Sequence, residues 1–249
     1  MGKLDGKVAI LTGAAGGIGR GILATLVREG ARVVATDLKQ DAIDAAVAEL
    51  GGGKAVGVAA DISKRADVQR VVKAAIDHYG RLDGLVNNAS ASRNKPLVEC
   101  TDDDMALALN TGIWATFYFM QECHPHLKVH GGSIVNFGSG AAISGQPKNG
   151  TYAAAKEAVR GMTRTAVREW GADRIRINVV LPFASSPAML QWAKDFPDLY
   201  QKSLGNVALG YAGDPKDDIA PVIAWLLSEE SRYVTGQTIA VDGGQIVAP

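Results

Sequence analysis

The sequence predicts an α/β fold: a single domain built on one doubly wound, Rossmann-like parallel sheet of about seven strands. Short runs rich in valine and isoleucine alternate with longer stretches that are apolar on one face and polar on the other. A glycine-rich turn follows the first of these runs, as in sheets that bind dinucleotides. No linker or low-complexity tract interrupts the 249 residues, so we expect one domain over residues 1–249.

The apolar runs have the length and the β-branched composition of buried strands. The expected strands are residues 7–12, 32–36, 55–59, 82–87, 133–137, 175–181 and 238–241. The expected helices are residues 17–29, 41–50, 64–78, 102–124, 152–170 and 215–227. Crossovers of this length join parallel strands, and repeated right-handed crossovers place helices on both faces of the sheet.

One long stretch, residues 182–214, has no clear strand or helix pattern. This length is unusual for a connection inside a compact domain. We therefore expect a substrate lid at about residues 183–213 that closes over the site and excludes water. Ordinary helix packing is the alternative role for its large apolar side chains, which are Met189, Leu190, Trp192, Phe196, Leu199 and Tyr200.

Composition argues against several kinds of partner. Lysine plus arginine equals aspartate plus glutamate at 26 each, so no net charge attracts a polyanion and no nucleic-acid partner is expected. The N-terminal residues lack the apolar segment of a signal peptide, and no later segment reaches membrane-spanning length. We expect a cytoplasmic protein without a membrane partner.

A cysteine close to three histidines could in principle bind zinc. The group consists of Cys123, His124, His126 and His130. Pro125 interrupts the helical spacing that a metal site would need, and no acidic base accompanies the group. We therefore expect no metal and interpret this segment as a helix end at the surface.

The glycine-rich turn at residues 12–19 reads Thr-Gly-Ala-Ala-Gly-Gly-Ile-Gly and opens the first helix. Free N–H groups and the helix dipole favour a phosphate at this position, and glycines let a pyrophosphate come close. The spacing Gly-x-x-x-Gly-x-Gly differs from the commoner Gly-x-Gly-x-x-Gly, so a plain tight turn is the alternative. The expected cofactor contacts in the turn are Gly13, Gly17, Ile18 and Gly19.

An acidic residue, Asp37, follows the second strand. A carboxylate here would accept hydrogen bonds from the adenosine ribose hydroxyls and would repel a 2′-phosphate. Gly16 leaves the turn without a basic residue that could offset this repulsion. We therefore expect NAD as the cofactor and consider NADP less favoured, with Arg32 and Lys39 as the nearby positive charges.

Several motifs, in order, resemble the short-chain dehydrogenase/reductase family over essentially the whole chain. The turn at 12–19 is similar to the family's cofactor fingerprint, Asp61 and Ile62 resemble its adenine-contacting pair, and residues 87–89 resemble its signature after the fourth strand. The resemblance implies further cofactor contacts from Asn88, Ala89, Pro182 and Ser186. The residues that match the family's catalytic tetrad are Asn110, Ser139, Tyr152 and Lys156.

The chemistry of alcohol oxidation explains the tyrosine and the lysine. A base must take the hydroxyl proton as the hydride leaves, and a free tyrosine, with a pKa of about 10, is too weakly acidic. Lys156 lies four residues after Tyr152, on the same helix face, where its charge stabilises the phenolate. The resemblance also implies that Lys156 binds the nicotinamide ribose. It assigns the substrate oxygen to Ser139 and a relay water to Asn110.

The chain departs from the family pattern near the pocket. Ser90 and Phe183 stand where the family usually has glycine, so Phe183 could form a pocket wall. No residue clearly replaces the threonine that contacts the carboxamide, and Ser186 is the nearest candidate. Arg93 and Lys148 are the few charged residues expected near the pocket, which favours a small uncharged alcohol or ketone.

Three functions fit these observations. The first is an NAD-dependent dehydrogenase that interconverts a secondary alcohol and its ketone. The second is a 3-oxoacyl thioester (acyl-carrier) reductase, which residues 242–244 also resemble, and the third is a non-catalytic dinucleotide-binding sensor. Helices 102–124 and 152–170 are apolar on more than one face, so we expect a homotetramer or homodimer, as is common in the family.

Overall fold

The computed structural model describes residues 2–247, so residues 1, 248 and 249 of the expected domain lie outside the described residues. Seven parallel strands form one sheet in the order β3-β2-β1-β4-β5-β6-β7. The strands are β1 (Val8–Thr12), β2 (Arg32–Asp37), β3 (Ala55–Ala59), β4 (Gly84–Asn87), β5 (Gly132–Phe137), β6 (Ile175–Pro182) and β7 (Thr238–Val241). The predicted α/β, doubly wound class is confirmed.

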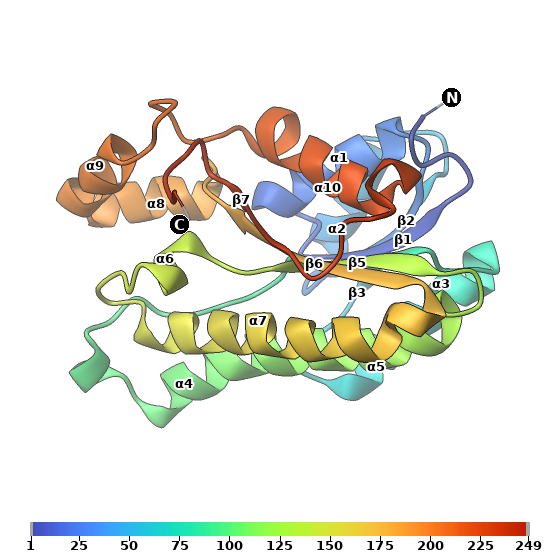
Figure 1. Cartoon of the computed structure of the whole chain (residues 1–249), viewed down its shortest axis with the longest axis horizontal. Helices are drawn as coiled ribbons and strands as arrows, with labels where there is room; N and C mark the ends of the chain where they lie inside the picture. Colours follow the sequence, from blue (N-terminus) through green and yellow to red (C-terminus); the bar gives the residue numbers. More distant parts are fainter. Residues whose placement is uncertain (1, 248–249) are drawn as a thin grey trace.

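Helices cover both faces of the sheet (Figure 1). The helices are α1 (Gly17–Arg28), α2 (Gln40–Ala48), α3 (Arg65–Tyr79), α4 (Asp102–Leu109), α5 (Ala115–Leu127), α6 (Gly140–Ile143), α7 (Gly150–Trp170), α8 (Pro187–Asp195), α9 (Pro197–Gly205) and α10 (Ala220–Leu227). Figure 1 shows α1, α2 and α10 on one face and α3, α5 and α7 on the other. Each face encloses its own cluster of buried apolar side chains, as expected for a sheet covered on both sides.

The strand order reverses between β1 and β4. Strand β1 pairs with β2 on one side and with β4 on the other, with Thr12 beside Thr36 and Leu11 beside Val86. Ligands bind outside the carboxyl ends of the strands at such a reversal. The register therefore brings the glycine-rich turn, the end of β2 and the end of β4 to one edge of the sheet.

The predicted helix at residues 102–124 is wrong as a single element. The chain forms α4, then a π-helical segment at Asn110–Trp114, and then α5, which continues through Pro125 to Leu127. Pro125 cannot donate to the carbonyl of Gln121, but Gln121 is exposed, so water can take that bond. The segment does contain a helix end at the surface, because α5 stops at Leu127 and residues 128–130 are exposed, but Cys123 is 0% exposed in the core.

The stretch at residues 182–214 is also more regular than expected, because it contains α8 and α9. Each helix has a proline in its first turn, Pro187 and Pro197, where the missing N–H costs nothing. The Ser186 hydroxyl caps α8 by accepting a hydrogen bond from the Met189 N–H. The last predicted helix likewise splits, into a π-helical segment at Pro215–Ile219 and α10.

No helix of the described residues is long and apolar enough to cross a membrane.

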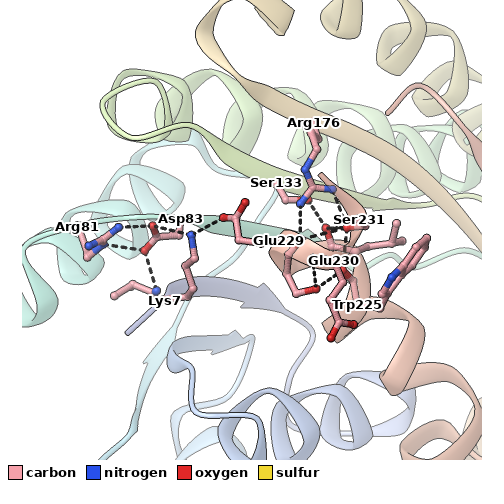
Figure 2. A network of polar contacts seen from close by, with 12 residues as sticks. Lys7, Arg81, Asp83, Ser133, Arg176, Trp225, Glu229, Glu230 and Ser231 are labelled. Atoms are coloured by element: carbon pink, nitrogen blue, oxygen red, sulfur yellow. Dashed lines mark hydrogen bonds and ion pairs between the residues drawn. The ribbon is translucent and has the colours of Figure 1, made fainter. Parts of the chain in front are cut away.

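A polar network joins the amino ends of the strands, at the edge opposite the glycine-rich turn (Figure 2). Asp83, only 6% exposed, accepts hydrogen bonds from the Val8 N–H at 2.9 Å and from Arg81 Nε at 2.8 Å. On the same edge, Arg176 donates to the Ser231 hydroxyl at 2.9 Å and to a neighbouring carbonyl. These bonds hold the β1–β4 pair and the segment after α10 in place.

We expect Asp83→Asn to lower the free energy of unfolding by about 1–3 kcal/mol. One carboxylate oxygen, which accepts a hydrogen bond from the Arg81 guanidinium, becomes an NH₂ group that cannot accept one, and the site is buried. Urea denaturation monitored by circular dichroism measures this change. Asp77→Asn is the matched control, since Asp77 pairs with Lys73 on the surface, and it should cost less than about 0.5 kcal/mol. Equal denaturation midpoints for the two variants would contradict the expectation.

Candidate active site

The glycine-rich turn depends on its glycines. Gly13 and Gly17 have φ angles of +67° and +55°, which favour glycine. A Cβ added at Gly19 would lie 1.9 Å from the Gly13 carbonyl oxygen, so no side chain fits there. The turn thus forms a bare backbone surface at the start of α1, which fits a pyrophosphate. Ile18 lines the cavity described below.

The end of β4 holds this turn in place. The Thr12 hydroxyl accepts hydrogen bonds from the backbone N–H groups of Asn88 and Ala89, each at 3.0 Å. The Asn88 side-chain amide donates to the carbonyls of Thr12 and Gly13 at 2.8 and 3.2 Å. Asn88 and Ala89, expected from the sequence as cofactor contacts, therefore also support the turn that would bind the cofactor.

Asp37 ends β2 beside the same turn. Its carboxylate accepts hydrogen bonds from the N–H groups of Ala15 at 3.0 Å and Leu38 at 2.8 Å. Arg32, considered above as a nearby cation, begins β2 and stacks on the Tyr79 ring instead. A strand of this length separates the two side chains by roughly 15 Å, so Arg32 does not offset the charge of Asp37.

Asp61 and Ile62 follow β3 at the same edge of the sheet. The Asp61 carboxylate accepts hydrogen bonds from the hydroxyl and N–H of Ser63, at 2.6 and 3.1 Å. The hydrogen bond from the Ser63 hydroxyl is the main cause that lowers the pKa of Asp61, so this carboxyl is ionised at neutral pH. Ile62 packs against the core below.

Ser139, Tyr152 and Lys156 come together at the other side of the switch point. Ser139 follows β5, while Tyr152 and Lys156 lie one turn apart on α7. Lys156 Nζ lies 5.6 Å from the centre of the Tyr152 ring and donates to the Phe137 carbonyl at 2.9 Å. The three side chains predicted to reach the reacting atoms thus share one site.

Burial shapes the acidity of the two titrating groups. Lys156 is 4% exposed, and this burial lowers its pKa from 10.5 to about 8. Burial also raises the pKa of Tyr152, and a hydrogen bond with Ser139 acts in the opposite direction. The tyrosine therefore needs a nearby positive charge to become a base, and protonated Lys156 is placed to supply it.

Asn110 does not join this site. It is exposed, begins the π-helical segment, and does not line the cavity that contains the other three residues. Two residues later, Gly112 is buried against α7, and a Cβ there would lie 2.9 Å from the Ala155 Cβ. The inward position next to Lys156 is therefore occupied by glycine backbone, so the structure does not support the predicted role of Asn110.

We expect Asn110→Ala to leave kcat within about twofold of the unaltered protein, because an exposed side chain outside the cavity contributes little to a buried reaction. Steady-state rates with a substrate alcohol measure the effect. Ser139→Ala serves as the comparison and should reduce kcat by about 10²-fold or more, since it removes a donor at the developing charge. A similar loss of kcat in Asn110→Ala would show that Asn110 acts together with Ser139, Tyr152 and Lys156, as the sequence predicted.

A cavity of about 750 Å³ is lined by Ser139, Tyr152 and Lys156. Pro182, Phe183 and Ser186 line it, and Phe183 is only 6% exposed. Phe183 thus lines the cavity at a position where the family usually has glycine. Ser90, the other departure, also lines the cavity.

Five of the six large apolar side chains predicted for the lid divide into two groups, and the sixth, Leu190, is 49% exposed. Met189, Trp192 and Leu199 line the cavity, as expected of a lid. Phe196 and Tyr200 instead pack against Trp192, with ring centres 6.4 and 6.3 Å away.

The charged residues near the cavity differ from those expected. Arg93 pairs with the buried Asp104 at 2.9 Å, and Lys148 sits over the Phe196 ring at 4.4 Å, so neither lines the cavity. Lys202 on α9, which the sequence did not single out, also lines the cavity together with Lys156. Lys202 lies three residues after Leu199, on the same face of α9, so a helix predicted at residues 197–205 would have placed both at the cavity.

Comparisons with known proteins agree with this geometry. A family model described as "Enoyl-(Acyl carrier protein) reductase" matches residues 13–245. A 12α-hydroxysteroid dehydrogenase of a Clostridium species is 40% identical and covers 98% of each chain. A 3-oxoacyl-(acyl-carrier-protein) reductase of Thermotoga maritima is 37% identical, over 98% of this chain and 100% of the relative.

Solved structures support the same conclusion. A short-chain dehydrogenase/reductase of Brucella melitensis superimposes with a TM-score of 0.92 at 34% identity, covering 100% of both chains. A short-chain alcohol dehydrogenase described for Sinorhizobium meliloti gives a TM-score of 0.92 at 30% identity, covering 97% of each chain. The chain belongs to the short-chain dehydrogenase/reductase family of oxidoreductases.

Proposed function

We propose that the protein is an NAD-dependent dehydrogenase that interconverts a secondary alcohol and its ketone. The observation that carries this proposal is the placement of Lys156, 5.6 Å from the Tyr152 ring, in a cavity that also contains Ser139. A tyrosine beside a buried cation is suited to act as a general base at neutral pH.

The residues present fit a dinucleotide. The bare turn at Gly13, Gly17 and Gly19 would hold the pyrophosphate, and a Cβ would fill this cradle at Gly19. Asp37 would accept hydrogen bonds from the adenosine ribose, next to Asp61 and Ile62, while Pro182 and Ser186 would border the nicotinamide. When bound, the dinucleotide accepts or donates the hydride.

The protein's own groups manage the proton and the oxygen. Tyr152 removes the hydroxyl proton in oxidation and returns it in reduction. Ser139 donates a hydrogen bond to the substrate oxygen where negative charge develops. Lys156, held by the Phe137 carbonyl, keeps a positive charge beside the phenol.

We propose NAD rather than NADP because of Asp37. Its carboxylate lies beside the turn that would bind the pyrophosphate, where a 2′-phosphate would meet a like charge. Arg20, the basic residue of α1 closest to the turn, already pairs with Glu49.

A 3-oxoacyl thioester reductase is the second candidate. The description of the family model and the relative from Thermotoga maritima favour it. The 12α-hydroxysteroid dehydrogenase relative, at 40% identity, favours an alcohol with a large apolar body instead. We place the dehydrogenase first because Asp37 would disfavour NADPH, the reductant best suited to biosynthetic reduction.

We also propose that the chain forms a homodimer or homotetramer. Trp114, 48% exposed, stacks with Phe117 and Tyr118 on the outer face of the π segment and α5. Light scattering of the purified protein measures the oligomeric state. A cytoplasmic location remains a prediction from the sequence.

The proposed function is tested by binding and turnover together. Nicotinamide fluorescence measures the affinity for NADH against NADPH, and absorbance at the nicotinamide band follows oxidation of aliphatic, cyclic and steroid alcohols. Tighter NADH binding with turnover of one alcohol class supports the proposal. Tighter NADPH binding with reduction of a 3-oxoacyl thioester supports the second candidate. Cofactor binding without any turnover favours a non-catalytic dinucleotide-binding sensor.

A further inference from the structure

The outer part of the cavity differs in chemistry from its catalytic part. Polar residues line it: Lys202 and Ser203 on α9, Asn206 just after α9, and Gln245 after β7. Gln245 donates to the Ser203 carbonyl at 3.2 Å, which ties the two segments together. Among the described residues that line the cavity there is no aspartate or glutamate.

Lys202 therefore brings a positive charge that nothing in the cavity neutralises. Asp198 lies one helical turn before Lys202 and could compete for it, but no ion pair joins Lys202 to any acid in the described part of the chain. The side chain is exposed, so keeping its charge costs little.

An apolar wall lies next to this polar group. Met189, Trp192 and Leu199 form it. The Trp192 ring is held by Phe196 and Tyr200, and Lys148 sits over the Phe196 ring at 4.4 Å, which connects the lid to the loop before α7. Figure 1 shows α8 and α9 together, across from the start of α7.

We infer that the substrate is an amphipathic acid, with an apolar body against the lid and a carboxylate that Lys202 binds away from the reacting carbinol. The inference rests on the proposed function, which supplies the reacting end. It replaces the expectation of an uncharged substrate, which depended on the scarcity of charged residues near the pocket and did not include Lys202. Asn206 and Gln245 offer amide donors to the same carboxylate.

Ligand binding without turnover tests the charge preference directly. Quenching of tryptophan fluorescence, to which Trp192 contributes, gives the affinities of decanoate and deoxycholate, each compared with its methyl ester. The unaltered protein should bind each acid about three- to tenfold more tightly than its ester, because the ion pair forms at a partly exposed rim. Salt should reduce this preference.

Variants identify the residue responsible. Lys202→Gln should abolish the preference for the acid, Lys202→Arg should retain it, and Lys194→Gln, an exposed lysine on α8 outside the cavity lining, should leave it unchanged. Equal or tighter binding of the esters, a preference unaffected by Lys202→Gln, or no binding of either acid would overturn the inference.

Turnover separates the inference from the proposed function. For a hydroxy acid that is oxidised, Lys202→Gln should raise KM by the same factor while kcat stays within about twofold, since uniform binding is lost. If no alcohol is oxidised but the acids still bind through Lys202, the proposed function fails and the anion site stands. If alcohols are oxidised but the acids are not preferred, the proposed function stands and the anion site fails.

Discussion

Replacing Tyr152 with phenylalanine is expected to reduce kcat by about 10³-fold or more, near the upper part of the range for general acid–base catalysis. The change removes one oxygen and keeps the ring, so the packing on α7 is conserved. Among the described residues that line the cavity, no other side chain has both a titrating oxygen and a buried lysine one helical turn away. Stopped-flow and steady-state nicotinamide absorbance with a substrate alcohol measure the loss.

The cofactor should still bind to Tyr152→Phe. The turn that would hold the pyrophosphate is supported by Thr12 and Asn88, which do not depend on Tyr152. Tyr200→Phe is the matched control, because Tyr200 packs on Trp192 outside the cavity lining, and it should keep at least half of the rate. Retained turnover in Tyr152→Phe would place the base elsewhere, and unchanged binding with no turnover in either protein would favour a sensor.

The pH dependence gives a second readout of the same chemistry. Oxidation needs the phenolate of Tyr152, so its rate should rise with pH, whereas ketone reduction needs the phenol and should fall. Below a pH of about 8, Lys156 is protonated and favours the phenolate, opposing the burial that raises the pKa of Tyr152. The rise should be absent from the residual rate of Tyr152→Phe.

Much of the fold follows from local patterns. Buried parallel strands are continuous apolar runs, so β1, in which every residue is buried, could be recognised directly. The turn at 12–19 was predictable because glycines at a helix start leave the backbone N–H groups free. Asp37 was predictable because a carboxylate at the end of the second strand carries a charge whatever the packing around it. The ends of elements were less exact, as β4 begins at Gly84 rather than at residue 82.

The errors share a physical cause, because each depends on packing between distant segments. Asn110 and Gly112 are neighbours in sequence, and only the π-helical turn and its contact with Ala155 decide which of them faces α7. Pro125 remains inside α5 because the packing of this helix on the core stabilises it by more than the loss of one hydrogen bond costs. Lys202 reaches the cavity only because α9 folds back over it.

Replacing Asp37 with asparagine is expected to weaken NADH binding by about 10- to 100-fold, since hydrogen bonds to a charged acceptor contribute roughly 1.5–3 kcal/mol each. NADPH binding should improve, because the like charge that faces a 2′-phosphate is gone. Together the two changes should reverse or erase the preference for NADH. Fluorescence titration of each reduced cofactor measures both affinities.

A second substitution sharpens this test. Leu38 follows Asp37 and is 67% exposed, so Leu38→Arg in the Asp37→Asn background would add a cation beside the ribose without disturbing the core. NADPH should then bind more tightly than NADH, and more so at low salt. Asp41→Asn, an exposed acid in the first turn of α2, is the control and should change neither affinity by more than about twofold. If Asp37→Asn leaves the NADH preference intact, the selection lies in another part of the adenosine site, and the proximity of Asp37 to the Ala15 N–H serves only to fix the turn.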